Sequence, residues 1–143
     1  MNTHPLEHLE AIDEAIVSEW ATQLHTSNTL YSTRPYEELL VTCRECFDAY
    51  IAAIRREDFE LLNRFIARIV SLRGALKFPE HEVVDAFRAF RKIASDHLLT
   101  GLIKENIDVE PISDVLDAIC QVVDYAILRF SEIYYTARVE RPH

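Results

Sequence analysis

The sequence predicts an all-α fold, a single domain of about five helices arranged as a helical bundle. Its 143 residues suit one domain with its own core. They are 49% hydrophobic but include only two glycines, a scarcity that helices tolerate better than hairpin-rich β folds. Four of the five prolines stand where an apolar pattern of helical spacing begins, and proline suits the first turn of a helix because its missing N–H would have no partner there.

The first helix is expected over residues 6–25, directly after Pro5. Its apolar residues recur at steps of three and four and therefore share one face: Leu9, Ile12, Ile16, Trp20 and Leu24. The stretch 25–34 is rich in Ser, Thr and Asn, whose side chains compete for backbone hydrogen bonds. It predicts a loop.

The second helix follows Pro35 and ends near Arg56. Its apolar stripe consists of Leu39, Cys43, Cys46, Tyr50 and Ile54. A third helix is expected over residues 58–73, with Asp58 as its N-terminal cap. Gly74 offers the left-handed residue that commonly closes a helix.

The fourth helix is expected from Pro79 to a stop at Gly101, and the fifth from about Pro111 to Tyr135. The fifth carries a heptad-like seam with further apolar residues beside it, so more than one of its sides must be covered. One covering surface could be a second subunit, and the helix could pass a signal onward. The residues predicted for this dimer contact and output helix are Ile112, Val115, Leu116, Ile119, Val122, Val123, Ala126, Phe130 and Ile133.

Composition excludes several classes of partner. The net charge of −9 argues against a nucleic-acid binder, because phosphate contacts need a basic face. No apolar run has the length that crosses a bilayer, and the charged start lacks the apolar region of a signal peptide. We therefore expect a cytoplasmic protein that binds neither nucleic acid nor membrane, with three reduced cysteines.

Cys43 and Cys46 form a CxxC pair, a spacing that can chelate zinc or cycle through a disulfide. A structural zinc site needs four ligands, and the chain has no second CxxC. The pair therefore indicates buried core cysteines, with a redox switch as an alternative. His25 and His97 lie at the ends of predicted apolar faces, so haem binding is a further alternative, although neither has a convincing second ligand nearby.

No pattern typical of catalysis stands out. There is no Ser-His-Asp order, no glycine-rich phosphate loop and no isolated pair of acids. Arg64, Arg68 and Arg73 could bind an anion, but a solvated face with local pairs to Asp58 and Glu60 is the simpler interpretation. The sequence predicts a protein that binds or senses and is not an enzyme, with no catalytic or metal residues and no required cofactor.

Several segments together resemble the N-terminal sensory domain of RsbR-type stressosome proteins, the RsbT co-antagonist family. They are Trp20, the YEELL of 36–40, the Phe-Pro of 78–79 and the VVDAFRAFR of 83–91. The likeness covers about residues 10–135. It implies a globin-like fold without haem, a homodimer, and a C-terminal STAS domain beyond this chain that would build the stressosome core with other STAS-domain proteins.

The leading hypothesis is a dimeric, non-catalytic sensor covering residues 1–143, the N-terminal part of a longer protein, which sends its signal through the fifth helix to a STAS or other output domain. Two alternatives remain open. One is a haem- or gas-binding sensor of globin type, and the other is a thiol redox switch at Cys43 and Cys46.

Overall fold

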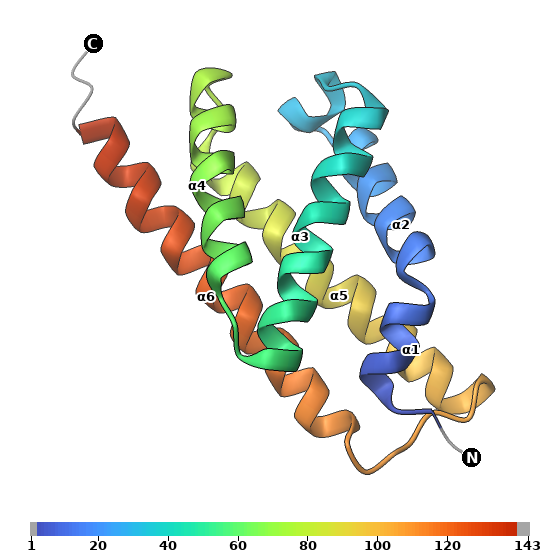
Figure 1. Ribbon diagram of the computed structural model, residues 1–143. Coiled ribbons are helices and arrows are strands. Elements are labelled where there is room, and N and C mark those ends of the chain that lie inside the picture. The colour runs from blue at the N-terminus through green and yellow to red at the C-terminus, as the bar shows by residue number, and fades with distance from the viewer. Residues whose placement is uncertain (1–2, 140–143) are drawn as a thin grey trace.

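The computed structural model describes residues 3–139 and confirms an all-helical single domain (Figure 1). Within these residues the only β-type pairing is an isolated bridge between Thr3 and Ile107. The described residues form six α-helices where about five were expected, together with one short 3-10 helix. They are α1 (Pro5–Ala11), α2 (Asp13–His25), η1 (Leu30–Thr33), α3 (Tyr36–Arg56), α4 (Glu60–Ala75), α5 (Glu80–Lys104) and α6 (Ile112–Val139).

The first expected helix is two helices, because the backbone of Ile12 leaves the helical region with φ −109° and ψ 26°. The Ile12 N–H still donates to the His8 carbonyl at 3.1 Å, and the Ile12 carbonyl accepts from the Ile16 N–H at 3.1 Å. Hydrogen bonds therefore cross the break, and α1 and α2 keep one apolar face. Leu9 and Ile16 on this face are fully buried.

The expected loop over 25–34 contains η1, whose first turn is held by a cap within the loop and by a bond to α5. The Thr29 hydroxyl accepts from the Tyr31 N–H at 3.2 Å, and the Glu82 carboxylate of α5 accepts from the Leu30 N–H at 2.9 Å. These bonds hold the Tyr31 ring inside the core, where it is 3% exposed.

Helix α4 begins at Glu60, two residues later than predicted, but the Asp58 carboxylate still accepts the Glu60 N–H at 3.0 Å. The prediction that Gly74 closes this helix is wrong. Gly74 is helical, and Lys77 takes the left-handed conformation with φ 60°. The Lys77 N–H bonds to the Gly74 carbonyl at 3.1 Å and the Phe78 N–H to the Arg73 carbonyl at 2.9 Å, a Schellman closure placed three residues later.

The prediction that Gly101 ends α5 is also wrong, because the helix continues to Lys104. Gly101 is buried where α1 and the segment after α5 approach the helix. A Cβ at this position would overlap the Ile107 side chain and come within 2.8 Å of His8 Nε2. The glycine therefore permits a close approach between segments. The chain turns at Asn106, whose φ is 54°.

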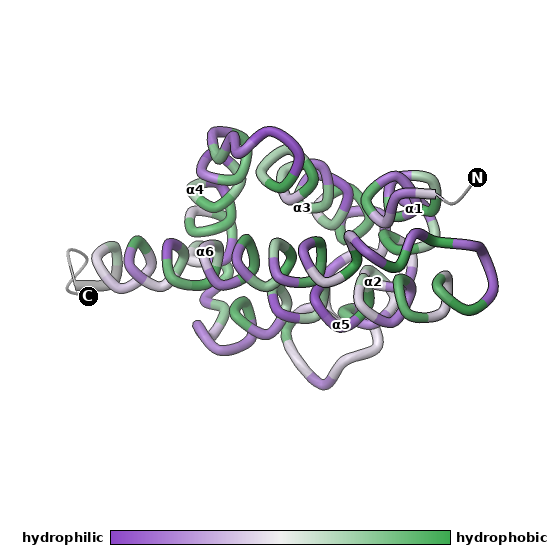
Figure 2. Tube along the Cα trace, turned by 90° about the horizontal axis from the view of Figure 1, so that it is seen from below, coloured by the Kyte–Doolittle hydropathy of each residue, from purple (hydrophilic) through white to green (hydrophobic). Residues whose placement is uncertain are grey.

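Helices α5 and α6 cross behind the layer of α2, α3 and α4, and the C-terminal turns of α6 extend past the rest of the bundle (Figures 1 and 2). Helix α6 packs against α3, α4, α5 and α1. Aromatic rings fill the centre: the Trp20 ring lies 5.4 Å from that of Phe90, which lies 4.8 Å from that of Tyr50. Trp20 Nε1 donates to the Ala86 carbonyl at 3.0 Å, so its polar atom is satisfied inside the core.

Candidate functional site

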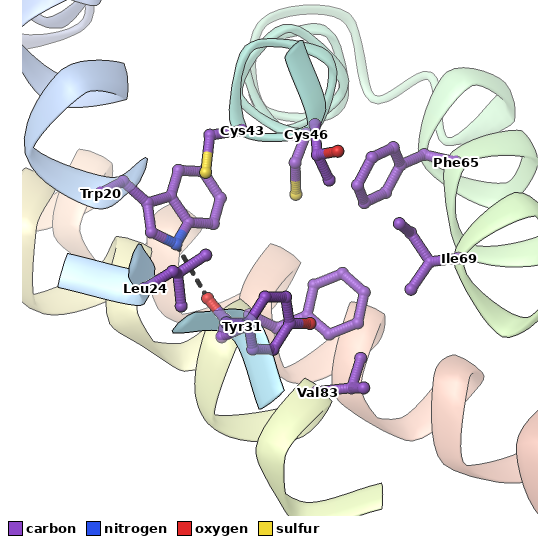
Figure 3. Close-up of a pocket in the computed structure, with 11 residues that line it drawn as sticks. Trp20, Leu24, Tyr31, Cys43, Cys46, Phe65, Ile69 and Val83 are labelled. Atoms are coloured by element: carbon purple, nitrogen blue, oxygen red, sulfur yellow. Dashed lines mark hydrogen bonds between the residues drawn. The ribbon is translucent and has the colours of Figure 1, made fainter. Parts of the chain in front are cut away.

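An apolar cavity lies between α2, η1, α3, α4 and α5 (Figure 3). It offers about 30 Å³ to the centre of a water molecule, which is enough for one or two waters or a small apolar group. In Figure 3 the labelled side chains surround an open centre. The lining residues are Trp20, Leu24, Tyr31, Thr42, Cys43, Cys46, Phe65, Ile69, Val83, Ala86 and Phe87.

Cys43 and Cys46 lie one turn apart on α3, and both thiols are buried at the wall of this cavity. Burial raises the pKa of Cys43 to about 12 and that of Cys46 well above its usual value. Both are therefore protonated thiols at neutral pH, and a thiol is a poor nucleophile and metal ligand. No group of three His, Cys, Asp or Glu side chains within residues 3–139 could hold a metal ion. The redox switch stays a prediction.

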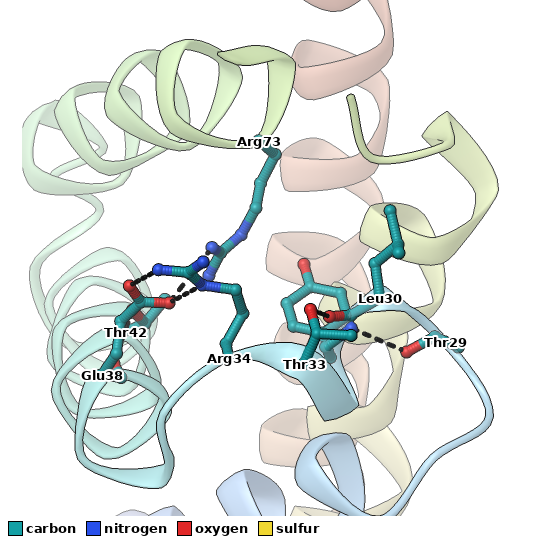
Figure 4. A network of polar contacts seen from close by, with 8 residues as sticks. Thr29, Leu30, Thr33, Arg34, Glu38, Thr42 and Arg73 are labelled. Carbon is teal, nitrogen blue, oxygen red and sulfur yellow. Dashed lines mark hydrogen bonds and ion pairs between the residues drawn. The ribbon is translucent and has the colours of Figure 1, made fainter. Parts of the chain in front are cut away.

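Arg73 of α4 is the one buried charged residue in the described part of the chain, with 1% of its surface exposed. Its guanidinium carbon lies 5.0 Å from the ring centroids of both Tyr31 and Phe78, and these two centroids are 4.8 Å apart. Nη1 is 3.6 Å from a Glu38 carboxylate oxygen, whereas Nε and Nη2 have no hydrogen-bond partner. Figure 4 shows the side chain reaching from α4 toward Arg34 and Glu38.

Glu38 is already committed to Arg34. The Arg34 Nε and Nη2 atoms donate to its two oxygens at 2.8 and 2.7 Å, a bidentate pair at the edge of the bundle. These hydrogen bonds lower the pKa of Glu38, so the carboxylate is ionised at neutral pH. Burial raises the pKa of Tyr31 to about 12, although the nearby Arg73 guanidinium opposes the shift. The Tyr31 hydroxyl therefore keeps its proton beside Arg73.

Helix α6 distributes the nine residues of the predicted dimer and output seam over two environments. Six of them lie in the core of this chain and face α3, α4 and α5: Val115, Ile119, Val122, Val123, Ala126 and Phe130. Ile112, Leu116 and Ile133 are partly buried. The heptad-like pattern therefore reflects intramolecular packing for most of its length. The exposed apolar side chains of α6 are Leu128 and Tyr135, which are 65% and 69% exposed.

An open outer groove of about 640 Å³ runs between α5 and α6. Leu99, Leu116 and Cys120 form its apolar part. Charged residues of both signs border it: Arg88 pairs with Asp85 at 3.1 Å, Lys92 with Asp96 at 2.7 Å, and Arg91 lies 4.0 Å from Asp124 of α6.

The histidines of the described chain lie away from the cavity. His97 is half-buried, with Nε2 2.7 Å from a carboxylate oxygen of Glu19. His4 caps α1, where its Nδ1 accepts from the Leu6 N–H at 3.1 Å, and His25 packs its ring against that of Tyr36. None of the cavity-lining residues is a histidine, and haem binding stays untested.

Residues 14–142 match the family model described as the RsbT co-antagonist protein rsbRD N-terminal domain. The chain belongs to this family. The match runs from the second residue of α2 through α6 and confirms the resemblance seen in the sequence. No curated protein matches, and no solved structure matches, so the globin-like arrangement stays a prediction. No helix within residues 3–139 of this RsbRD-type domain is long and apolar enough to cross a membrane.

The three arginines of α4 were predicted to share one solvated face, but they lie in different environments. Arg64 pairs with Glu60 as predicted, and Arg68 pairs with Glu45 of α3. Arg73 is buried instead. The sequence spacing could have predicted this burial, because Arg73 continues the apolar stripe of α4 at steps of three and four residues. The preceding members of this stripe are Leu62, Ile66 and Ile69.

Proposed function

We propose that this RsbRD-type domain is a non-catalytic sensory domain of a stressosome regulator, acting in the cytoplasm as a homodimer. Its input is the interior region of the cavity and Arg73, and its output is α6, which passes the signal to a C-terminal STAS or other domain. Family membership supports the stressosome setting. The observation that carries the proposal is a direct connection between the buried site and α6.

That connection has two contacts. Phe78 stacks on Arg73, and its carbonyl accepts a hydrogen bond from the Tyr134 hydroxyl of α6. Phe87 lines the cavity, and its ring lies 5.7 Å from that of Phe130 on α6. A change in the packing around the site therefore acts on two consecutive turns of α6. Because packed cores shift between discrete arrangements and do not deform continuously, such contacts can turn a local change into a displacement of the helix.

For the dimer we propose a second copy on the outer groove between α5 and α6. Leu99 in this groove is 50% exposed, and Leu128 further along α6 is 65% exposed. The charges on this face alternate in sign, as the Arg88–Asp85 pair illustrates. In a two-fold contact each copy presents the same surface, so cations of one copy can meet carboxylates of the other. A partner with charges of a single sign would fit this face less well.

Sedimentation velocity of the purified chain tests the dimer. We expect a dimer at micromolar concentration, and Leu99→Glu is expected to weaken it by at least about tenfold, since burying an unpaired carboxylate costs more than 1.4 kcal/mol. Val41→Glu on α3 is the matched control, because Val41 is an exposed apolar residue at 57% and lies outside the groove. A wild-type monomer, or equal effects of the two variants, would contradict the proposed interface.

The sequence of the full-length gene product tests the output. A STAS segment following α6 without a break in the helical pattern supports transmission through this helix. A full-length product that stops within a few residues of position 143 would contradict it.

A further inference from the structure

The side chain of Arg73 presents a buried edge that no group within residues 3–139 satisfies. Nε and Nη2 are the two atoms without hydrogen-bond partners among the described residues, and they share one edge of the planar guanidinium. In proteins this pair of N–H groups is the edge that takes a carboxylate through two parallel hydrogen bonds. The rings of Tyr31 and Phe78 each lie 5.0 Å from the guanidinium carbon and 4.8 Å from one another, so both pack on one side of the group and neither hydrogen-bonds the Nε–Nη2 edge.

The charges around Arg73 do not balance. Arg34, Glu38 and Arg73 together carry a net charge of +1, and Arg34 engages Glu38 by two short hydrogen bonds. Arg73 has only the 3.6 Å contact to the same carboxylate. A buried guanidinium with an incomplete counter-charge carries a large desolvation cost, because water no longer solvates it. One monoanion at the free edge would neutralise the cluster and satisfy both N–H groups.

We infer that Arg73 binds a small monocarboxylate with a short apolar tail, held by two hydrogen bonds from Nε and Nη2. A planar carboxylate matches the Nε–Nη2 edge of Arg73. Its single negative charge matches the excess positive charge of the cluster formed by Arg34, Glu38 and Arg73. The protein carboxylate nearest Arg73, that of Glu38, is already taken by Arg34, and Arg73 is 1% exposed, so a side chain of a folded partner does not reach it. The ligand is therefore a free small molecule.

The neighbouring cavity accommodates the tail. Tyr31 both stacks on Arg73 and lines the cavity, and Cys43 lies on the same wall within reach of the Arg73 charge. The lining is apolar apart from the Tyr31 and Thr42 hydroxyls and the two thiols. Its volume of about 30 Å³ limits the tail to a few carbons. This inference deepens the proposed sensory function and rests on it for its meaning, because it names the class of ligand that the site receives.

Calorimetric titration and thermal unfolding of the purified chain test the inference, with sodium acetate, propionate and butyrate as probes. Sodium chloride and sodium phosphate at equal ionic strength serve as reference salts, so that screening of surface charges is matched. We expect the carboxylates to bind and to raise Tm in proportion to the logarithm of their concentration, and the reference salts to have no such effect. The fluorescence of Trp20, the only tryptophan and a cavity-lining residue, is expected to change on binding.

Arg73→Met removes the charge and keeps the apolar stem, and a buried ion replaced by an apolar group of similar size usually leaves a folded protein. Carboxylate affinity is expected to fall by about a hundredfold, as loss of a buried bidentate charge pair implies. Arg73→Lys retains the charge without the planar edge and is expected to recover only part of the affinity. Arg64→Met on the same helix is the control, because the Arg64 side chain is 72% exposed.

Absence of carboxylate binding to the wild-type chain overturns the inference, and so does equal binding by phosphate or chloride. Unchanged binding by Arg73→Met overturns it as well, because the ligand would then lie elsewhere. Sedimentation of the same samples separates this result from the proposed function. A dimer that does not bind carboxylates contradicts only the ligand assignment. A monomer that binds carboxylates contradicts only the proposed dimeric state of the sensor.

Discussion

At the scale of single residues, burial decides the chemistry of the CxxC pair. Cys43 and Cys46 project from one face of α3 into the core, and the low polarity there disfavours the charged thiolate. The third cysteine, Cys120, is half-buried on α6 beside the outer groove. Residue type and spacing are shared with redox sites, but the surroundings of Cys43 and Cys46 keep both sulfurs protonated.

We therefore expect unequal alkylation of the three cysteines in the native protein. Iodoacetamide at neutral pH should modify Cys120 and leave Cys43 and Cys46 unmodified, because alkylation requires an accessible thiolate. Mass spectrometry of peptides after timed quenching measures each site, and a sample unfolded in denaturant provides full modification. Rapid labelling of Cys43 in the native state would show that the core opens there, and would favour the redox alternative.

Burial has the opposite outcome for Arg73, whose side chain stays charged. A guanidinium does not lose its charge in a protein, so burial cannot neutralise it as it neutralises a thiol. The cost is offset by the rings of Tyr31 and Phe78 and by the longer contact to Glu38. The Nε and Nη2 atoms keep no hydrogen-bond partner among the described residues, and we assign the ligand to this edge.

At the scale of elements, helix boundaries depend on contacts from other parts of the chain. Gly74 and Gly101 both carry the residue type that commonly ends helices, yet both are inside helices. Gly101 is required by the approach of Ile107 and His8, whereas a Cβ at Gly74 would make an ordinary van der Waals contact, 3.9 Å from the Tyr134 ring. Tertiary packing therefore requires a glycine at position 101 but not at position 74.

Alanine substitutions should separate them. Gly74→Ala is expected to raise the free energy of unfolding by about 0.5–1 kcal/mol, because alanine is the better helix former and fits. Gly101→Ala is expected to lower it by about 1–3 kcal/mol, because the methyl group forces the neighbouring segments apart. Chemical denaturation followed by circular dichroism measures both. Equal stabilisation by the two changes would mean that α1 and the segment at Ile107 do not pack closely on α5.

Helix α6 illustrates how one apolar pattern can serve two purposes. Its steps of three and four suggest a seam between subunits, and the same steps are required of any helix that crosses a core. Phe130 and Ile119 are fully buried within the chain, so the surface left for a second copy is narrower than the pattern implies. It includes the flank that carries Leu116 and Cys120 in the outer groove.

At the scale of the whole molecule, several buried acids are held in their neutral form together. Burial raises the pKa of Tyr31 and of Cys43 to about 12, and raises the pKa values of Cys46 and Tyr50 well above their usual range. In the unfolded chain these groups lose their protons at their ordinary values, 9.0 for the cysteines and 10.0 for the tyrosines. Between those values and the raised ones, the folded state binds more protons than the unfolded state.

The free energy of unfolding is therefore expected to fall with rising pH above about pH 9, while below that pH these four groups contribute no pH dependence. Urea denaturation at a series of pH values measures the decline. The double change Cys43→Ala and Cys46→Ala should make it shallower, because only the tyrosines then contribute, and Cys120→Ala is the control. A stability that is flat to pH 11 would contradict the burial of these groups.

The sequence by itself determined the helical class, the approximate position of five segments and the family resemblance, since these depend on local propensity, on the spacing of apolar residues and on proline at helix starts. It also placed Cys43 and Cys46 on an apolar face. Tertiary structure alone decided that Arg73 is inside with a free edge, and that Gly101 is a point of close approach. It decided too that most of the α6 seam is core. These features depend on which segments meet in space, and the spacing of residues along one helix does not specify what lies opposite its face.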